Sequence, residues 1–404
     1  MSRRDALKLG AATAAAAVVA DAALADEADA SSGYDRHYRS RKKSSDYSDE
    51  MFDIEAAKAG AWAPSRYGTD DQRGAFNELT PRRTGRALRR LDQRSVNTYQ
   101  LGEEMFNGFP AFTSIPPREH NMFCYTLGFD PGGDFTALGG IVAGADPLGP
   151  NELTGFEERF TENFTFQIAS QIDGLNHIGV GTTYYNGFDG IDDMAAPLGT
   201  KKLGNEHMGP VVTRGVILDI VGLKVAAGAT DDFFTAPNGE HVLRDDYRIT
   251  IDDIENAMFR QRVRRKLGPG DVPILHTGWT HLVRSDPSRY LVQEPGVYLA
   301  EARYFADCRV SMVAGDTWGF EVRGGDDAVH GPNIFPVHQE LITKNGIRIG
   351  ESFVTDSAIA DNCYDGVLVA TPENVPGATC GSSPPAFLGN PGRPPRRHRH
   401  IVKS

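Results

Sequence analysis

The sequence predicts an α/β protein built around a mixed central sheet. Strand-like and helix-like segments alternate along the chain, which is typical of α/β or mixed-sheet domains. The composition is that of a folded globular protein, with 40% hydrophobic and 24% charged residues in a chain of 404. No repeat of roughly 20 to 50 residues is visible, which argues against a solenoid or a propeller.

The first elements follow from local signals. Residues 80–93 indicate a short helix, because Thr80 is a favourable N-cap and Pro81 suits the first helical position. Residues 209–224 are rich in Val and Ile, and they predict a strand.

The second half of the chain continues the alternation. Residues 250–271 predict a helix that Thr250 caps and that ends at Gly268. Strands are then expected at residues 272–282, 309–316, 347–352 and 365–372. Helices are expected at residues 299–308 and 337–346.

Both ends of the chain differ from the body. Residues 1–25 combine twin arginines, an Ala-rich stretch and a small-residue end, and they resemble a bacterial Tat signal, which implies a periplasmic or secreted protein. Residues 26–50 predict a flexible leader, because they hold almost nothing to bury. A single domain is expected over 51–390, followed by a basic disordered tail at 391–404.

Charge and cysteine usage narrow the partners. The net charge of -12 argues against nucleic acid or an anionic membrane surface and favours a small-molecule substrate without stable membrane insertion. The cysteines have no C-x-x-C spacing, so isolated core thiols are expected, with one or two disulfides left open. The four are Cys124, Cys308, Cys363 and Cys380.

The candidate chemistry centres on the stretch QIDGLNH. It holds Asp173 and His177, while His338 and Glu351 lie near a predicted helix start and on the following strand. One imidazole and two carboxylates suit Zn, Mn or Fe with open positions for water. On spacing alone, the favoured interpretation is a capping histidine, a strand-end acid and a turn aspartate with no metal.

Several stretches, taken in order, change the balance. Five stretches in this order together resemble the cyclase family of metal-dependent hydrolases, which includes kynurenine formamidase and isatin hydrolase. They are RYGTDDQRGAFNELTP, GPVVTRGVILDI, DVPILHTGW, AGDTWGFEV and VHQELITKNGIRIGE. The likeness runs from about residue 60 to about residue 390. It implies the swivelling β/β/α, cyclase-like fold and a homo-oligomer.

The family signature H-x-G-T-H-x-D-x-P-x-H aligns without a gap with QIASQIDGLNH, residues 167–177. The resemblance therefore implies that Asp173 is a metal ligand and His177 the general acid/base. Gln167 and Gln171 stand where the family has two metal-binding histidines, so the first metal position is weakened or lost. The second position, implied to consist of Asp173, His338 and Glu351, would hold one divalent ion, Zn or Mn.

This resemblance predicts a hydrolase acting on carbon-nitrogen bonds, in the manner of arylformamidases. Metal-bound water would open an amide or lactone of a small, aromatic or cyclic substrate. Large aromatics are as often simply core. The residues expected to bind or orient substrate are Gln171, Gln167, Tyr184, Trp279 and Trp318. The alternative is a periplasmic small-molecule binding protein, or a metal-free lyase or cyclase that uses His177 alone.

Overall fold

The computed structural model describes residues 42–106, 108–112, 120–123, 125–127, 158–160, 166–323 and 333–396. The chain divides into two compact units, Met1–Tyr47 and Ser48–Ser404. The predicted signal lies outside the described residues, as do most of the predicted leader and residues 397–404 of the predicted tail. Within the first unit, the described residues form one 3-10 turn, η1 (Ser44–Asp46).

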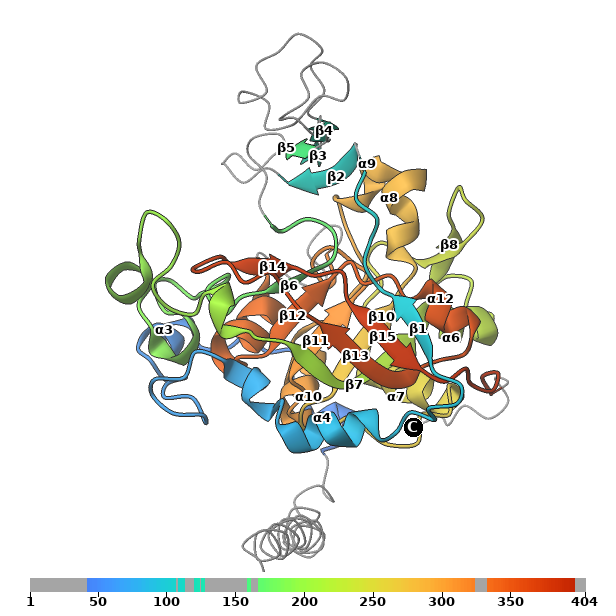
Figure 1. The fold of residues 1–404 in the computed structure, drawn as a ribbon, viewed down its shortest axis with the longest axis horizontal. Helices are drawn as coiled ribbons and strands as arrows, with labels where there is room; N and C mark the ends of the chain where they lie inside the picture. The colour runs from blue at the N-terminus through green and yellow to red at the C-terminus, as the bar shows by residue number, and fades with distance from the viewer. Residues whose placement is uncertain are drawn as a thin grey trace, which may run out of the picture. The chain divides into compact units, whose positions relative to one another are not determined.

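The second unit is built on a nine-stranded mixed sheet (Figure 1). Its four central strands β7, β10, β11 and β12 run parallel, and the strands on both sides of them are antiparallel to their neighbours. This confirms the predicted α/β class with a mixed central sheet. The spatial order is β1 (Asn97–Gln100), β15 (Ala386–Gly389), β13 (Asp365–Ala370), β7 (Val211–Asp219), β10 (Val272–His276), β11 (Met312–Gly315), β12 (Arg348–Glu351), β6 (Gln171–Asp173) and β14 (Cys380–Ser382).

Among the described residues, three two-stranded ribbons accompany the main sheet. Each is antiparallel, as expected for short hairpin-like pairs. They are β2 (Phe109–Phe112) with β3 (His120–Phe123), β4 (Tyr125–Leu127) with β5 (Glu158–Phe160), and β8 (Phe233–Thr235) with β9 (His241–Leu243).

Helices surround the parallel strands. Helices α6 and α7 contact each other, α6 contacts strand β10, α7 contacts strand β7, and α10 contacts α7. The helices are α3 (Ile54–Lys58), α4 (Pro81–Leu88), α6 (Ile220–Ala227), α7 (Ile251–Arg260), α8 (Leu282–Ser285), α9 (Pro287–Tyr290), α10 (Leu299–Cys308), α11 (Pro336–His338) and α12 (Asp356–Ala360), with short turns η2 (Gly74–Glu78), η3 (Tyr185–Gly187), η4 (Gly190–Met194), η5 (Asn205–His207), η6 (Trp279–His281) and η7 (Gln339–Lys344). Within the described ranges, we find no helix with the length and apolar character needed to cross a bilayer.

Two predicted elements end earlier than the sequence suggested. The apolar run 209–224 is a strand only to Asp219, because the Asp219 side chain accepts a hydrogen bond from the Gly222 amide and caps helix α6. The helix predicted over 250–271 begins as expected after Thr250 but ends at Arg260. Arg262 has a φ of 62°, in the left-handed region, and this interrupts the helical path well before Gly268.

The sheet also contains short strands that have no strong pattern of their own. The predicted strand 365–372 contains β13, and β14 and β15 follow it. β14 pairs with β6 at one edge of the sheet, whereas β15 lies between β13 and β1 near the other edge. The chain after residue 372 therefore completes both sides of the sheet.

The hydrophobic core lies mainly against the central strands. One cluster includes the fully buried residues Ile172, Ile217, Ile274, Met312 and Leu368, each from a different strand of the sheet. A second cluster gathers around Trp279, Tyr290 and Phe109. Cys308, Cys363 and Cys380 are buried, as expected for core cysteines, and Cys124 lies outside the described residues.

Candidate metal centre

The candidate site forms where strands β12 and β6 run side by side. Glu351 is the last residue of β12, and its register partner on the antiparallel strand β6 is Gln171. Asp173 ends β6. His338 is the last residue of the short helix α11, which leads through η7 directly into β12.

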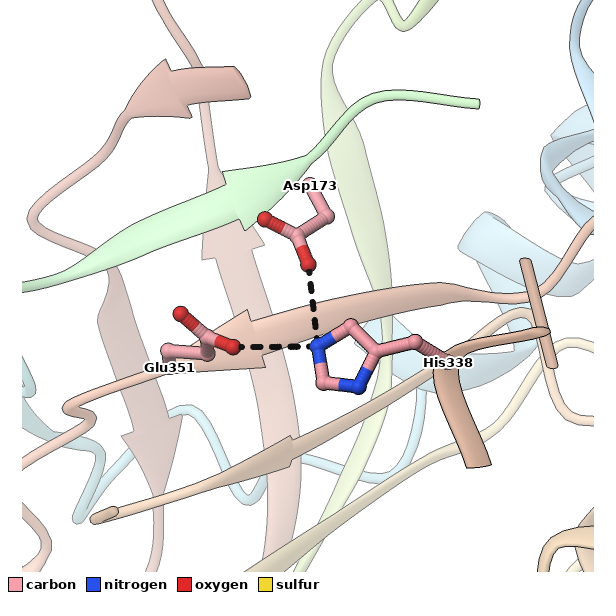
Figure 2. A group of neighbouring side chains, drawn as sticks. All are labelled: Asp173, His338 and Glu351. Atoms are coloured by element: carbon pink, nitrogen blue, oxygen red, sulfur yellow. Dashed lines mark ion pairs between the residues drawn. The ribbon is translucent and has the colours of Figure 1, made fainter. Parts of the chain in front are cut away.

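Three side chains from these segments converge on one point. The Nε2 atom of His338 lies 3.6 Å from Oδ2 of Asp173 and 3.4 Å from Oε1 of Glu351. Figure 2 shows both carboxylates directed at the same ring nitrogen. The three ligand atoms all lie within 4.8 Å of one another, and all three residues are buried. Sequence reasoning named these three residues, and the structure brings them together.

The spacing fits a shared cation. Nitrogen and oxygen atoms bound tetrahedrally at about 2.1 Å from a zinc ion lie roughly 3.4 Å from one another. The two distances from Nε2 of His338 are close to that value. One imidazole and two carboxylates are a donor set suited to Zn, Mn or Fe, and they leave coordination positions for water or substrate.

The two carboxylates are in an unfavourable state without a cation. Asp173 is 0% exposed, and no hydrogen bond of ordinary geometry within the described residues reaches either of its oxygens, although Gln167 lies near enough to lower its pKa. Burial, and next the charge of Glu351, raise the pKa of Asp173 well above its usual range. Burial also raises the pKa of Glu351, although the hydrogen bond with His338 lowers it. A divalent ion would offset both charges.

Glu321 orients the imidazole of His338. Its Oε1 lies 2.5 Å from Nδ1 of His338, and it also accepts hydrogen bonds from the backbone amides of Val337 and His338. A proton held on Nδ1 by this carboxylate leaves the lone pair on Nε2, toward Asp173 and Glu351. A carboxylate that accepts a hydrogen bond from a metal-binding histidine is a common arrangement, and it raises the basicity of that histidine.

Replacing Glu321 by glutamine is expected to weaken Zn²⁺ affinity by about 10- to 100-fold. The amide keeps the shape of the side chain but loses the charge that fixes Nδ1–H of His338. Isothermal titration calorimetry with zinc measures the change, and the exposed Glu255→Gln variant is the matched control. Equal affinities in both variants would show that Glu321 does not support the site.

The two glutamines at the signature positions connect this centre to His177. Nε2 of Gln171 donates to Oε2 of Glu351 at 2.6 Å and to Oε1 of Gln167 at 2.7 Å. Nε2 of Gln167 lies 3.3 Å from Nδ1 of His177. The His177 and His338 rings have centroids 6.5 Å apart, so His177 stands beside the group of three residues and outside it.

Backbone strain marks the same region. Ala169, Phe335 and Ser352 have φ values of 56°, 53° and 55°, in the left-handed region that residues with a side chain rarely adopt. Each stands within three residues of a candidate site residue. Such strained residues are characteristic of functional sites, where the surrounding structure holds them in place.

The predicted aromatic residues occupy different environments. Trp318 packs edge-on against Phe335 with ring centroids 6.3 Å apart, and Phe335 packs against His338 at 4.9 Å, so these two rings lead to the candidate centre. Trp279 is fully buried, and its Nε1 donates to the backbone oxygen of Tyr290 in the second core cluster. The ring of Tyr184 lies against Gly190 of its own loop.

Sequence reasoning did not single out Glu321, Glu294 or Phe335. Glu294 is 0% exposed, and one of its oxygens accepts hydrogen bonds from the amides of Trp318 and Gly319. Burial, followed by the charge of Glu351, raises its pKa well above the usual range. Glu321 lies within the stretch AGDTWGFEV, whereas Glu294 and Phe335 lie outside the family-like stretches, and only the tertiary structure places all three near His338.

Comparisons with known proteins find one solved structure with the same overall fold and further, weaker matches. A structure described as a novel cyclase is 28% identical, covers 84% of this chain and 99% of its own, and has a TM-score of 0.64. Isatin hydrolase A from Labrenzia aggregata, bound to benzyl benzoate, is 14% identical and covers 76% of this chain and 98% of its own, with a TM-score of 0.49. Isatin hydrolase A from Ralstonia solanacearum, also 14% identical, covers 73% and 92%, with a TM-score of 0.48. No curated protein matches the sequence significantly.

A family model described as "Putative cyclase" matches residues 99–322. The matched segment contains Asp173, His177 and the two glutamines, and His338 and Glu351 follow it. Because the match spans more than half of the chain, this protein belongs to the cyclase family.

Proposed function

We propose that this protein is a metal-dependent hydrolase that opens an amide C–N bond or a lactone C–O bond of a small cyclic or aromatic substrate. The observation that carries the proposal is the convergence of His338 Nε2 with two buried carboxylates, one of which lacks hydrogen bonds of ordinary geometry within the described residues. Membership of the cyclase family supports the same reading.

Asp173, His338 and Glu351 would hold one Zn²⁺ or Mn²⁺ ion. Such an ion, when bound, polarises a carbonyl group and lowers the pKa of a water molecule toward about 7. Glu321 keeps the His338 ring turned so that Nε2 faces the ion. Burial of all three ligands excludes bulk water and strengthens each electrostatic interaction in the site.

The neighbouring side chains indicate how substrate would be held. His177 stands beside the centre, within reach of a group bound there. Trp318 and Phe335 form an edge-to-face pair next to His338, and they offer a flat apolar surface to an aromatic or cyclic substrate.

Elemental analysis of freshly purified protein, combined with turnover assays, tests the proposal. The assays use an indoline-2,3-dione, an N-aryl formamide and an aryl lactone. We expect roughly one equivalent of zinc or manganese and hydrolysis of at least one substrate that stops on chelation and returns when the ion is restored. Metal-free protein that binds these compounds without cleaving them would instead establish a binding protein.

Zinc binding is expected to release at least one proton near neutral pH. Burial lowers the pKa of His338, but hydrogen bonds with Glu321 and Glu351 and the charge of Asp173 outweigh it and raise the pKa to about 10. The ring is therefore protonated in the ion-free protein, and the proton on Nε2 must leave before an ion binds. Affinity then falls about tenfold for each pH unit below that pKa. Titration calorimetry in two buffers of different ionisation enthalpy measures the release, and a value of zero would contradict the assignment of His338.

A further inference from the structure

We propose that Gln167 and Gln171 form a directional hydrogen-bond relay from Glu351 to His177, and that this relay makes His177 a neutral hydrogen-bond donor to the substrate instead of a general acid/base. The inference rests on the proposed function for the identity of the site. Its evidence is the unbroken series of contacts from Glu351 through Gln171 and Gln167 to the imidazole.

The direction of the relay is set at Glu351. An ionised carboxylate only accepts hydrogen bonds, so the Gln171 amide must turn its NH₂ group toward Oε2 of Glu351. The same nitrogen lies 2.7 Å from the Gln167 carbonyl oxygen and gives it a second hydrogen. Turning the Gln171 amide around would place its carbonyl oxygen against the carboxylate and against a second carbonyl, with no donor between them.

The orientation of Gln167 follows from that of Gln171. Because its carbonyl oxygen accepts from Gln171, its NH₂ group faces Nδ1 of His177 at 3.3 Å. The contact with Gln171 therefore sets the orientation of the Gln167 amide.

The tautomer of His177 is the consequence. A proton on Nδ1 would point at the amide hydrogens of Gln167, so Nδ1 must present its lone pair. The single proton of the neutral ring then resides on Nε2. In this form the ring donates a hydrogen bond to a substrate carbonyl oxygen and stabilises the negative charge that develops there, but Nε2 has no lone pair with which to accept a proton.

The two positions that in the family signature bind a metal thus have a different task in this chain. The resemblance to the family implies an acid/base role for His177, and the amide relay reassigns it to electrostatic stabilisation. Gln167 and Gln171 act through His177 and Glu351, so they are positioning residues.

Gln167→Glu and Gln167→Met test the relay. A carboxylate at this position accepts from Nδ1 and moves the proton there, whereas methionine removes the contact without a charge. Nitrogen-15 spectra of the histidine rings, recorded on zinc-loaded protein and assigned with His177→Gln, show which nitrogen carries the proton. We expect Nε2–H in the wild type and in the exposed control Gln100→Glu, and Nδ1–H in Gln167→Glu.

Activity provides the second measurement. Gln167→Glu is expected to lose about 10²-fold in kcat, the usual effect of losing one donor to a developing oxyanion, with KM and zinc content nearly unchanged, and Gln167→Met is expected to lose less. A wild-type proton on Nδ1, or the same tautomer in wild type and Gln167→Glu, would overturn the relay. Absence of turnover by the zinc-loaded wild type would refute the proposed function instead, because the tautomer is read from the spectrum without turnover.

Discussion

Replacing Asp173 by alanine is expected to abolish the binding of a divalent ion and to reduce hydrolysis by about 10³-fold or more, since an ion that polarises a carbonyl contributes several kcal/mol to catalysis. Asp173 supplies one of two carboxylates in the group of three ligands, and it is the one with the fewest hydrogen bonds. Elemental analysis and zinc titration measure the binding, and turnover assays measure the rate.

The asparagine variant at the same position separates charge from shape. Asp173→Asn keeps the volume of the side chain and removes one of two buried negative charges, so the ion-free protein is expected to become more stable by about 1 kcal/mol or more. The exposed Asp192→Asn variant is the control, and thermal unfolding with chelator present is the measurement. Unchanged zinc affinity in either Asp173 variant would remove this residue from the site.

Restoring the two signature histidines is expected to create a second metal position. In the variant Gln167→His/Gln171→His, we expect the zinc content to rise from roughly one to roughly two equivalents, because imidazole is a far better ligand than a neutral amide. Gln171 already lies 2.6 Å from Oε2 of Glu351, on the carboxylate oxygen that does not face His338, so an ion there could share Glu351.

Single variants and a distant control make this result specific. Gln171→His alone is expected to bind the added ion weakly, since only one imidazole joins the shared carboxylate. Gln100→His, on an exposed strand position, should leave the stoichiometry unchanged. If the double variant still binds a single ion with wild-type affinity, the glutamines do not stand where a second ion would bind.

Much of the fold could be predicted because it is encoded locally. Helix α10 occupies the predicted residues 299–308, and β10 lies within the predicted strand 272–282. Strands β6 and β14, of three residues each, carry no such pattern. Their positions depend on pairing with each other and with β12, and a single sequence does not reveal which distant segments pair.

The candidate site likewise has residues that the sequence predicts and residues that it does not. Asp173, His338 and Glu351 were found from the sequence because side chains with ligand chemistry fell at positions matching a family pattern. Glu321 was not found, because its part depends on the path that brings it to Nδ1 of His338. For Trp279 the sequence left a pocket wall and the core equally open, and its ring lies in the second core cluster.

The shortness of β6 has a consequence for how an ion would be retained. β6 pairs with β12 at two positions and with β14 at three, so few backbone hydrogen bonds oppose its local opening. An ion bound by both Asp173 and Glu351 would hold β6 and β12 together. Departure of the ion would free the strand that carries its own ligand, so release and local unfolding would reinforce each other, and the ion would exchange on the timescale of sheet fluctuations.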